Sequence, residues 1–262
     1  MKILFLADVV GKSGRAALSK YVPLLKTKYD IGFTIVNGEN SAHGKGITFR
    51  IYNAFKSYGV DCITLGNHAF SKHEILDHIH ECDDLVYPNN HPLAPDELGI
   101  KTYTISGSKL HVVNVLGNAF MSPEPTCSPY ALMDDFLNTI DANDLVFVDF
   151  HGETTAEKRA FFECYKSRCI AIVGTHTHVQ TADEMIDEGC AFISDAGMVG
   201  PYHSVLGRDI DQCITMMRDG INLRYQVSEE IAMVCGVVIT VDDISHRASA
   251  IERIQIRPGD KL

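Results

Sequence analysis

Short apolar runs alternate with longer amphipathic stretches along most of this 262-residue chain, and this alternation constrains the fold more than any other feature. Several runs are apolar throughout, as expected of strands that are buried on both faces of a sheet. The alternation therefore predicts an α/β sandwich in which helices pack on the outer faces of the sheet layer. The expected strands are Ile3–Ala7, Phe33–Asn37, Cys62–Leu65, Lys109–Val115, Leu145–Phe150, Ile170–Val173 and Ala191–Ser194. The expected helices are Gly14–Tyr29, Phe49–Tyr58, Ser71–His80, Ala131–Ile140 and Thr155–Lys166.

The C-terminal part of the chain has a different pattern. Ile231–Val241 and Ala248–Ile256 predict a β-hairpin joined by the polar turn Asp242–Arg247. No repeat, low-complexity tract or long flexible linker divides the sequence. We therefore expect residues 1–262 to form a single domain, with a small lobe around residues 180–224.

Composition and charge exclude some classes of function. The formal net charge of −11 argues against broad binding to nucleic-acid backbones, because such binding depends on phosphate neutralisation by Lys and Arg. No apolar run approaches the roughly 20 residues needed to span a bilayer, so we expect no membrane partner. The apolar opening meets Asp8 and lacks a small-residue cleavage site, which favours a buried strand over a signal peptide. With eight cysteines and no CxxC pair, we expect reduced thiols in a cytoplasmic protein.

Acidic, amide and imidazole side chains follow five of the expected strands. These residues are Asp8, then Glu39 and Asn40, then Asn67 and His68, then His151, and finally His176 and His178. In open α/β sheets, ligands bind beyond the carboxyl ends of the strands. Each residue alone has an ordinary explanation as a helix cap, a turn residue or a hydrogen-bonded histidine. Five strand ends that place such groups toward one edge are hard to explain by turn chemistry, so the pattern predicts a metal site.

The types of donor constrain the metal. Carboxylate, amide oxygen and imidazole donors without a thiolate suit Fe, Mn, Zn or Co better than Mg or Ca, which favour all-oxygen shells. The seven candidate ligands are Asp8, Glu39, Asn40, Asn67, His151, His176 and His178. Seven donors are too many for one tetrahedral ion and suit two ions bridged by one carboxylate. Such a pair, about 3.5–4 Å apart, can hold a phosphate and generate a hydroxide at neutral pH.

At these positions the sequence resembles the calcineurin-like metallophosphoesterase superfamily. The blocks D-x-H, G-D, G-N-H-[DE], a lone H and G-H-x-H correspond here to Asp8–Gly11, Gly38–Asn40, Gly66–His68, His151 and Gly174–His178. Two positions depart from these blocks, because Val10 replaces the histidine of the first and Glu39 replaces the aspartate of the second. Both departures are similar to the bacterial YmdB subfamily, as are residues 35–46, 173–183 and 195–201.

The resemblance implies a four-layer α/β/β/α sandwich of the metallophosphoesterase type. It also implies a dinuclear centre, with Fe as the first choice of metal and Mn or Zn as alternatives, and phosphodiesterase activity on 2′,3′-cyclic nucleotides. Asp8, Glu39, Asn40 and His178 would hold one metal, and Glu39, Asn67, His151 and His176 the other. Glu39 would bridge the two ions, and Asn40 would replace the ligand lost at Val10.

We expect a hydroxide to attack phosphorus in line with the leaving group, and His68 to donate a proton. As general acid, His68 would protonate the leaving ribose oxygen, although a histidine that merely orders its loop is the alternative. His43 lies in a glycine-containing loop near Glu39 and is a weaker candidate for contact with the substrate. Lys45 and Arg15 could contact phosphate, but surface roles are more ordinary for both. His203 receives no role.

Other functions stay open at this point. A phosphomonoesterase such as a nucleotidase would use nearly the same site, and comparing a cyclic diester with a terminal phosphate separates the two activities. A nucleotide-binding signalling protein with weak hydrolysis would keep full function in cells after Asp8→Ala. Purely structural metals fit poorly, because structural sites are usually closed and rich in thiolates. The expected partner is a small nucleotide or phosphodiester, together with further copies of this chain in a homo-oligomer.

Overall fold

The first sheet of the computed structural model, which describes residues 1–95, 99–105 and 107–261, contains eight described strands. Their order is β2-β12-β13-β1-β3-β4-β5, and β14 pairs with β13. The bounds are β1 Lys2–Leu6, β2 Asp8–Val9, β3 Phe33–Asn37, β4 Cys62–Thr64, β5 Leu85–Val86, β12 Met198–Pro201, β13 Ala232–Val241 and β14 Ala248–Ile256. Strands β1, β3, β4 and β5 run parallel, so their carboxyl ends meet at one edge.

The second sheet has the order β10-β11-β9-β8-β7-β6. The bounds are β6 Lys101–Ile105, β7 Ser108–Leu116, β8 Leu145–His151, β9 Ala171–Thr175, β10 Met185–Asp187 and β11 Cys190–Ile193. Its central strands β7, β8, β9 and β11 are parallel. The carboxyl ends of β8 and β9 therefore lie side by side, with His151 paired to Thr175.

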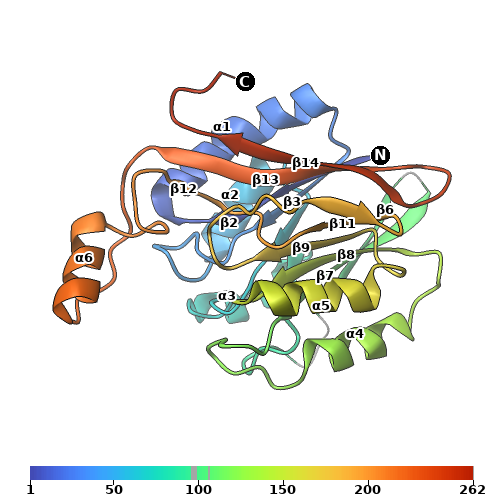
Figure 1. Ribbon diagram of the computed structural model, residues 1–262, viewed down its shortest axis with the longest axis horizontal. Helices are drawn as coiled ribbons and strands as arrows, with labels where there is room; N and C mark the ends of the chain where they lie inside the picture. The colour runs from blue at the N-terminus through green and yellow to red at the C-terminus, as the bar shows by residue number, and fades with distance from the viewer. Residues whose placement is uncertain (96–98, 106, 262) are drawn as a thin grey trace.

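The two sheets pack face to face, and helices cover their outer faces (Figure 1). Alternation along β1 explains how: Leu4 and Leu6 belong to the helix-facing core, while Ile3 and Phe5 belong to the core between the sheets. The Phe5 ring lies 5.6 Å from that of Phe147 on β8, centroid to centroid. The covering helices are α1 Gly11–Tyr29 and α2 Phe49–Ser57 on the first sheet, and α4 Pro129–Leu137 and α5 Thr155–Tyr165 on the second. The predicted four-layer α/β/β/α sandwich is confirmed.

Some predicted elements differ from the structure. The helix expected over Ser71–His80 is wrong: the segment forms only the short α3 Glu74–Asp77 and a 3₁₀ turn, Ile79–Glu81. Within these two elements Ile75 is the one buried residue, and Leu76 and Ile79 pack against the core only partly buried, so little apolar burial is available to stabilise a longer helix. The late hairpin is confirmed as β13 and β14, joined over Asp242–Arg247.

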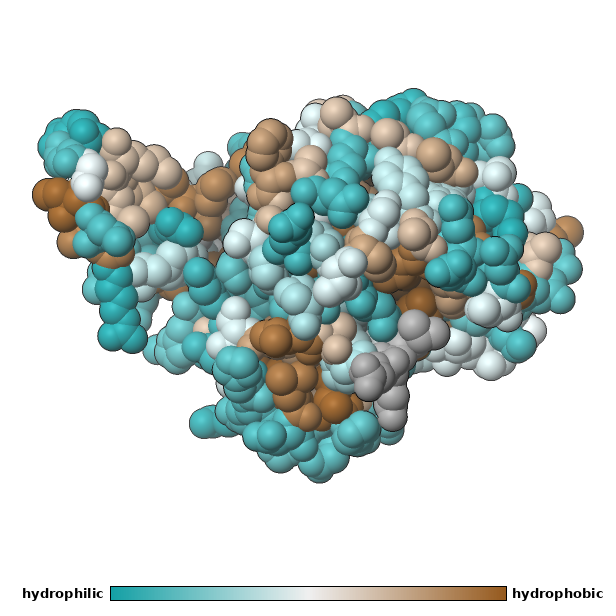
Figure 2. Space-filling model, turned by 90° about the horizontal axis from the view of Figure 1, so that it is seen from below, coloured by the Kyte–Doolittle hydropathy of each residue, from teal (hydrophilic) through white to brown (hydrophobic). Residues whose placement is uncertain are grey.

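Helix α6, Ile210–Asp219, projects from the sandwich beside the carboxyl edge of the first sheet (Figure 1). It lies within the region expected to form a small lobe, where the sequence analysis assigned no helix. Ile214 and Met217 on this helix and Ile221 just after it are exposed, and hydrophobic patches are visible on the projecting left end in Figure 2. In the described part of the chain, no helix combines the length and apolar character that crossing a bilayer requires. The assignment of residues 1–262 to one domain stays a prediction.

Candidate metal centre

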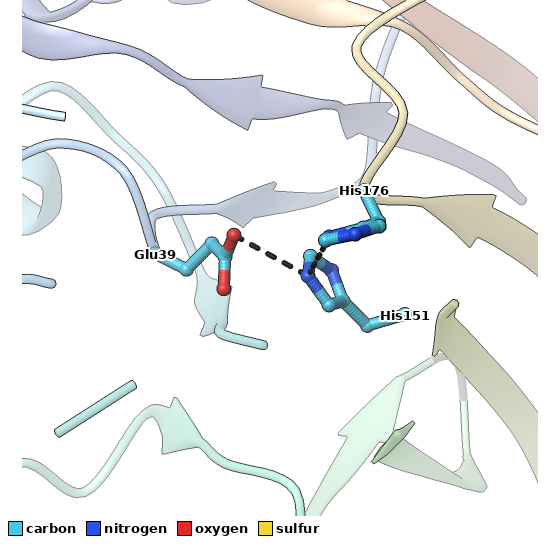
Figure 3. A group of neighbouring side chains, drawn as sticks. All are labelled: Glu39, His151 and His176. Carbon is cyan, nitrogen blue, oxygen red and sulfur yellow. Dashed lines mark hydrogen bonds and ion pairs between the residues drawn. The ribbon is translucent and has the colours of Figure 1, made fainter. Parts of the chain in front are cut away.

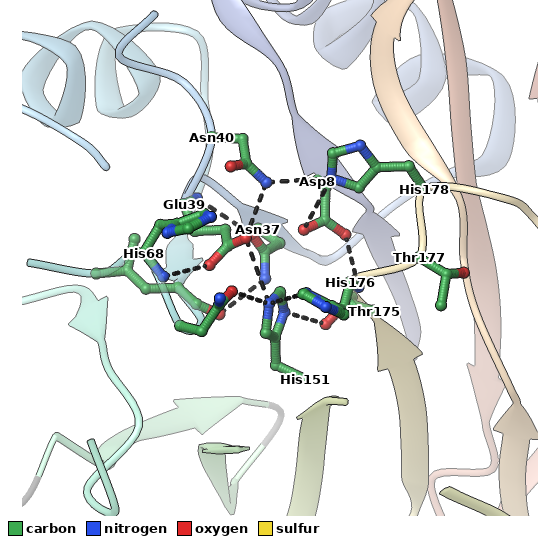
Figure 4. A network of polar contacts seen from close by, with 12 residues as sticks. Asp8, Asn37, Glu39, Asn40, His68, His151, Thr175, His176, Thr177 and His178 are labelled. Atoms are coloured by element: carbon green, nitrogen blue, oxygen red, sulfur yellow. Dashed lines mark hydrogen bonds and ion pairs between the residues drawn. The ribbon is translucent and has the colours of Figure 1, made fainter. Parts of the chain in front are cut away.

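The carboxyl ends of β1, β3, β4, β8 and β9 bring the predicted ligands to one edge of the sandwich. Each strand ends at or just before a candidate donor, as the sequence pattern predicts. Figure 4 shows the side chains of Asp8, Glu39, Asn40, His151, His176 and His178 pointing toward one another from these strand ends. Most of the group is buried, and the side chain of His178 is 12% exposed. The structure therefore gathers acids, amides and imidazoles in a pocket that little water reaches.

Glu39, His151 and His176 form the tightest cluster of potential metal donors among the described residues (Figure 3). One donor atom from each lies within 4.8 Å of the others. His151 Nε2 lies 3.3 Å from Glu39 Oε1 and 3.0 Å from His176 Nδ1. These are three of the four residues that the family resemblance assigns to one metal.

Asn67, the fourth residue of that set, is oriented by the backbone. Its side-chain Nδ2 donates to the carbonyl oxygen of Ser122 at 2.7 Å, which turns Oδ1 toward the cluster. Asn67 Oδ1 lies 3.0 Å from His151 Nε2. Since Oδ1 is the only metal-binding atom of the amide, this orientation is the one that a ligand role requires.

Asp8, Asn40 and His178, which the resemblance assigns with Glu39 to the other metal, lie beside this cluster. His178 Nδ1 donates to the carbonyl oxygen of Leu206 at 3.0 Å, so Nε2 keeps its lone pair and faces Asp8 Oδ1 at 3.8 Å. Asn40 presents its Nδ2 to Glu39 Oε1 at 2.8 Å and to His178 Nε2 at 3.1 Å. Its amide would have to flip before Oδ1 could bind a cation.

An unsatisfied oxygen on Asp8 shows that this pocket fits a cation. Asp8 is fully buried, and its Oδ1 has no hydrogen-bond partner within the described structure. Burial raises the pKa of Asp8 to about 7, because desolvation outweighs the opposing charges of His178 and His151, and a cation bound at Oδ1 would favour the carboxylate form. Burial also lowers the pKa of His176 to about 3, which keeps this imidazole in the neutral form that binds metals. The donor set and its electrostatics both suit metal ions.

The turn that carries His176 and His178 is held in an unusual conformation. Both residues have positive φ values, 102° and 64°, which are costly for residues other than glycine. A buried ion pair supports the turn: Lys158 Nζ donates to Asp195 Oδ2 and to the Thr175 carbonyl, while Asp195 accepts from the backbone N–H of Thr177. These contacts hold the backbone of the turn in its costly conformation and so fix the directions of the two imidazoles.

A hydrogen-bond relay fixes which nitrogen of His151 faces the centre. Thr175 Oγ1 donates to Asp149 Oδ1 at 2.6 Å and must therefore accept from His151 Nδ1, 2.9 Å away. His151 Nε2 is then the atom left for a metal. Asp149 is itself held by Thr64 Oγ1 and Asn37 Nδ2, and it is completely buried. Sequence analysis missed Asp149, although an acid inside the apolar run of β8 was a usable signal.

We expect Thr175→Val to lower metal affinity about 10–100-fold, because losing a hydrogen bond that orients a ligand typically costs that much. Thr175→Ser should restore affinity, since it keeps the hydroxyl. Thr64→Val is the matched control: it removes another hydroxyl from Asp149 but does not touch His151. Competition for Mn²⁺ with a fluorescent chelator measures the three affinities. Equal losses in Thr175→Val and Thr64→Val would contradict the relay.

Metal uptake should release a proton from His151. Burial alone would lower its pKa, but the adjacent Glu39 outweighs burial and raises the pKa of His151 to about 9. At pH 7.5 the metal-free imidazole therefore carries the proton on Nε2 that ligation must displace. Calorimetric titration of the protein with metal, in buffers of different ionisation enthalpy, measures the number of protons released. We expect about one proton per chain at pH 7.5, and this number should fall toward zero above pH 9. A proton release that does not change with pH over this range would contradict the assignment of this proton to His151.

His68 lies at the mouth of the centre, and its backbone N–H donates to Glu39 Oε2 at 3.0 Å. Its side chain lines a cavity of about 290 Å³ together with Glu39, Asn40, His176 and His178. Lys45, Arg208 and Tyr225 line the same cavity, and the last two were missed because no local motif marks them. His43 does not line it: its exposed side chain borders two neighbouring cavities instead.

Comparisons with known proteins agree with this arrangement. The chain is 43% identical to a 2′,3′-cyclic-nucleotide 2′-phosphodiesterase of Bacillus subtilis over 98% of this chain and 97% of that protein. A crystal structure of a phosphatase from Mycoplasma pneumoniae superposes with a TM-score of 0.92 at 35% identity, covering 98% of this chain and 93% of the other. A hypothetical protein from Thermus thermophilus gives a TM-score of 0.89 at 31% identity, covering 97% and 98%. A family model described as YmdB-like protein matches residues 4–254, and the chain belongs to this family.

Proposed function

We propose that this protein is a dinuclear-metal phosphodiesterase that hydrolyses 2′,3′-cyclic nucleotides. The observation that carries the proposal is that the seven candidate ligands meet in one buried pocket, where Oδ1 of Asp8 has no hydrogen-bond partner among the described residues. The phosphodiesterase named among the relatives gives the substrate class. Following that name, the bond cleaved is the one between phosphorus and O2′, which leaves a 3′-phosphate.

Two bound cations would neutralise the charge that develops on the phosphate oxygens and lower the pKa of a water molecule at the centre. Asp8, Asn40 and His178 would hold one ion, and Asn67, His151 and His176 the other, with Glu39 between them. Leu206, Thr175 and Ser122 hold the ligands His178, His151 and Asn67 in the orientations that this requires. The chain thus fixes these three ligands before any substrate arrives.

In this proposal, His68 acts on the leaving group. Its side chain lines the cavity above the centre, and its backbone is tied to Glu39. When the P–O2′ bond breaks, the ribose O2′ takes the bonding electron pair and needs a proton, which the His68 imidazolium supplies. Lys45 and Arg208 line the same cavity and favour an anionic substrate there.

Turnover of 2′,3′-cyclic AMP compared with 3′-AMP and 5′-AMP tests the proposal, using metal-loaded protein and chromatography of the products. We expect the cyclic diester to give 3′-AMP and the two monoesters to persist. Monoester hydrolysis at a comparable rate would make the protein a phosphomonoesterase. Nucleotide binding without turnover of any substrate would overturn the enzymatic proposal in favour of a nucleotide-binding protein.

A further inference from the structure

Three cavities adjoin one another around the loop of residues 43–46. The first is the cavity over the metal centre, which Tyr225 lines. Tyr225 also lines the second, of about 860 Å³, and His43 and Lys72 line both the second and a third, of about 390 Å³. Because they share these residues, the three cavities are neighbours, and an extended ligand bound at the metal centre would cross the shared side chains to reach the other two.

Positive charge is concentrated in the three cavities. Seven of the chain's 23 Lys and Arg residues line the three cavities, but only three of its 34 acidic residues do. The seven are Lys12, Arg15, Lys45, Arg50, Lys72, Arg208 and Arg224, and the acids are Glu39, Asp209 and Glu229. None of the seven forms a salt bridge with a described residue. In a chain of net charge −11, this local reversal favours an anionic ligand.

Aromatic side chains line the same cavities as these cations. The guanidinium of Arg208 lies 4.3 Å from the centroid of the Tyr225 ring in the first cavity, and Tyr225 also lines the second. Gly44 lets this ring approach closely, since a Cβ at Gly44 would lie 2.7 Å from a ring carbon. Tyr58 lines the third cavity. Cationic side chains beside aromatic rings are the combination that binds single-stranded nucleic acid, because the cations contact phosphates and the rings stack on bases.

A mononucleotide would leave most of this surface unused. A 2′,3′-cyclic nucleotide has one phosphate, and the metal centre would hold it in the first cavity. The second and third cavities, with Lys12, Lys72, Arg50 and Arg224, have the charge for further phosphates. The surface is local, so it is compatible with an overall acidic chain that does not bind nucleic-acid backbones broadly.

Building on the proposed phosphodiesterase activity, we propose that the preferred substrate is the 3′ end of an RNA strand that carries a 2′,3′-cyclic phosphate. The terminal cyclic phosphate enters the cavity over the metal centre, and the preceding nucleotides run past Tyr225 toward His43, Arg50 and Arg224. Water opens the terminal ring at the P–O2′ bond, which leaves a 3′-phosphate on the strand. The reaction that supplies this substrate is any RNA cleavage in which the 2′-hydroxyl attacks the adjacent phosphodiester.

Two measurements test this proposal on the metal-loaded protein. The first compares kcat/KM for a pentaribonucleotide that ends in a 2′,3′-cyclic phosphate with kcat/KM for 2′,3′-cyclic AMP. The second measures binding of a fluorescein-labelled pentaribonucleotide that ends in a 3′-phosphate, by anisotropy. We expect the oligonucleotide to be preferred at least about tenfold. With about three neutralised phosphates, its binding should also weaken about tenfold between 50 and 150 mM salt.

The test variant is Arg50→Glu/Arg224→Glu, because both side chains are exposed and neither lines the metal cavity. It should lower the oligonucleotide-to-mononucleotide ratio of kcat/KM about tenfold and flatten the salt dependence. The control Lys28→Glu/Lys261→Glu makes the same change in net charge at exposed positions outside the three cavities, and it should behave as wild type.

The outcomes separate this proposal from the phosphodiesterase proposal. Hydrolysis of 2′,3′-cyclic AMP with no preference for the oligonucleotide and no salt-dependent binding would overturn the RNA proposal alone. Salt-dependent binding that Arg50→Glu/Arg224→Glu abolishes, without turnover of either substrate, would uphold RNA binding and overturn the phosphodiesterase. Displacement of the oligonucleotide by an equal concentration of hexaglutamate would overturn RNA as the ligand and assign the surface to an acidic protein segment.

Discussion

Glu39→Ala should leave the protein folded, with fewer than two metals per chain and turnover of 2′,3′-cyclic AMP reduced at least about 1000-fold. Metal ions supply several kcal/mol of charge stabilisation in such reactions, and each 1.4 kcal/mol is a factor of about ten in rate. Glu39 is the carboxylate at the middle of the pocket, in contact with Asn40, His151 and the backbone of His68. Its loss therefore affects both halves of the centre at once.

Elemental analysis and turnover of the same preparation check the Glu39→Ala result. Glu230→Ala is the matched control, because Glu230 is exposed and lies outside the metal cavity. Glu39→Gln adds a second comparison, since it keeps the size and one oxygen but removes the charge. A Glu39→Ala protein that retained two metals and more than a tenth of wild-type activity would exclude a bridging role.

His68→Ala should retain both metals and lose about 10²–10³ in kcat on 2′,3′-cyclic AMP, which is the usual contribution of a general acid. A substrate with a good leaving group separates proton donation from loop ordering. Bis(p-nitrophenyl) phosphate releases a phenolate that needs little protonation, so the loss on that substrate should be within about tenfold. His73→Ala, at an exposed histidine a few residues away, should behave as wild type.

The pH profile gives a second signature of His68. Burial lowers the pKa of His68 below its ordinary value of 6.5, and the acid that donates a proton is the protonated imidazole. The fraction of that form falls as pH rises through the pKa, so log kcat/KM should decline with a slope of about −1 across neutral pH. His68→Ala should remove this decline. A large, equal loss on both substrates with the decline intact would show that His68 only orders its loop.

The parallel part of the fold and the metal donors could be predicted because both depend on local sequence. Runs such as Ile3–Ala7 are buried on both faces, so they are apolar throughout and easy to recognise. Since parallel strands end at a common edge, the residue after each run is placed without knowledge of the strand order. Asp8, Glu39 and His151 were assigned to the site in this way, and the structure brings them together.

The remaining features depend on contacts that are distant in the sequence. Tyr225 reaches the cavity because it packs on Gly44, 181 positions earlier in the chain, and no local pattern marks that contact. Thr175 precedes the His176-x-His178 motif and carries no signal of its own, and its relay to Asp149 becomes visible only when β8 and β9 are paired. Short elements such as β12 also lack the length that makes a strand recognisable.

Titration of metal-free protein with Mn²⁺ tests the dinuclear site most directly. Turnover of 2′,3′-cyclic AMP and the electron paramagnetic resonance spectrum would be recorded at each addition. We predict that activity rises until two equivalents per chain and that the spectrum develops the exchange coupling of two adjacent Mn²⁺ ions. Full activity at one equivalent, with the spectrum of an isolated ion, would contradict the two-metal site.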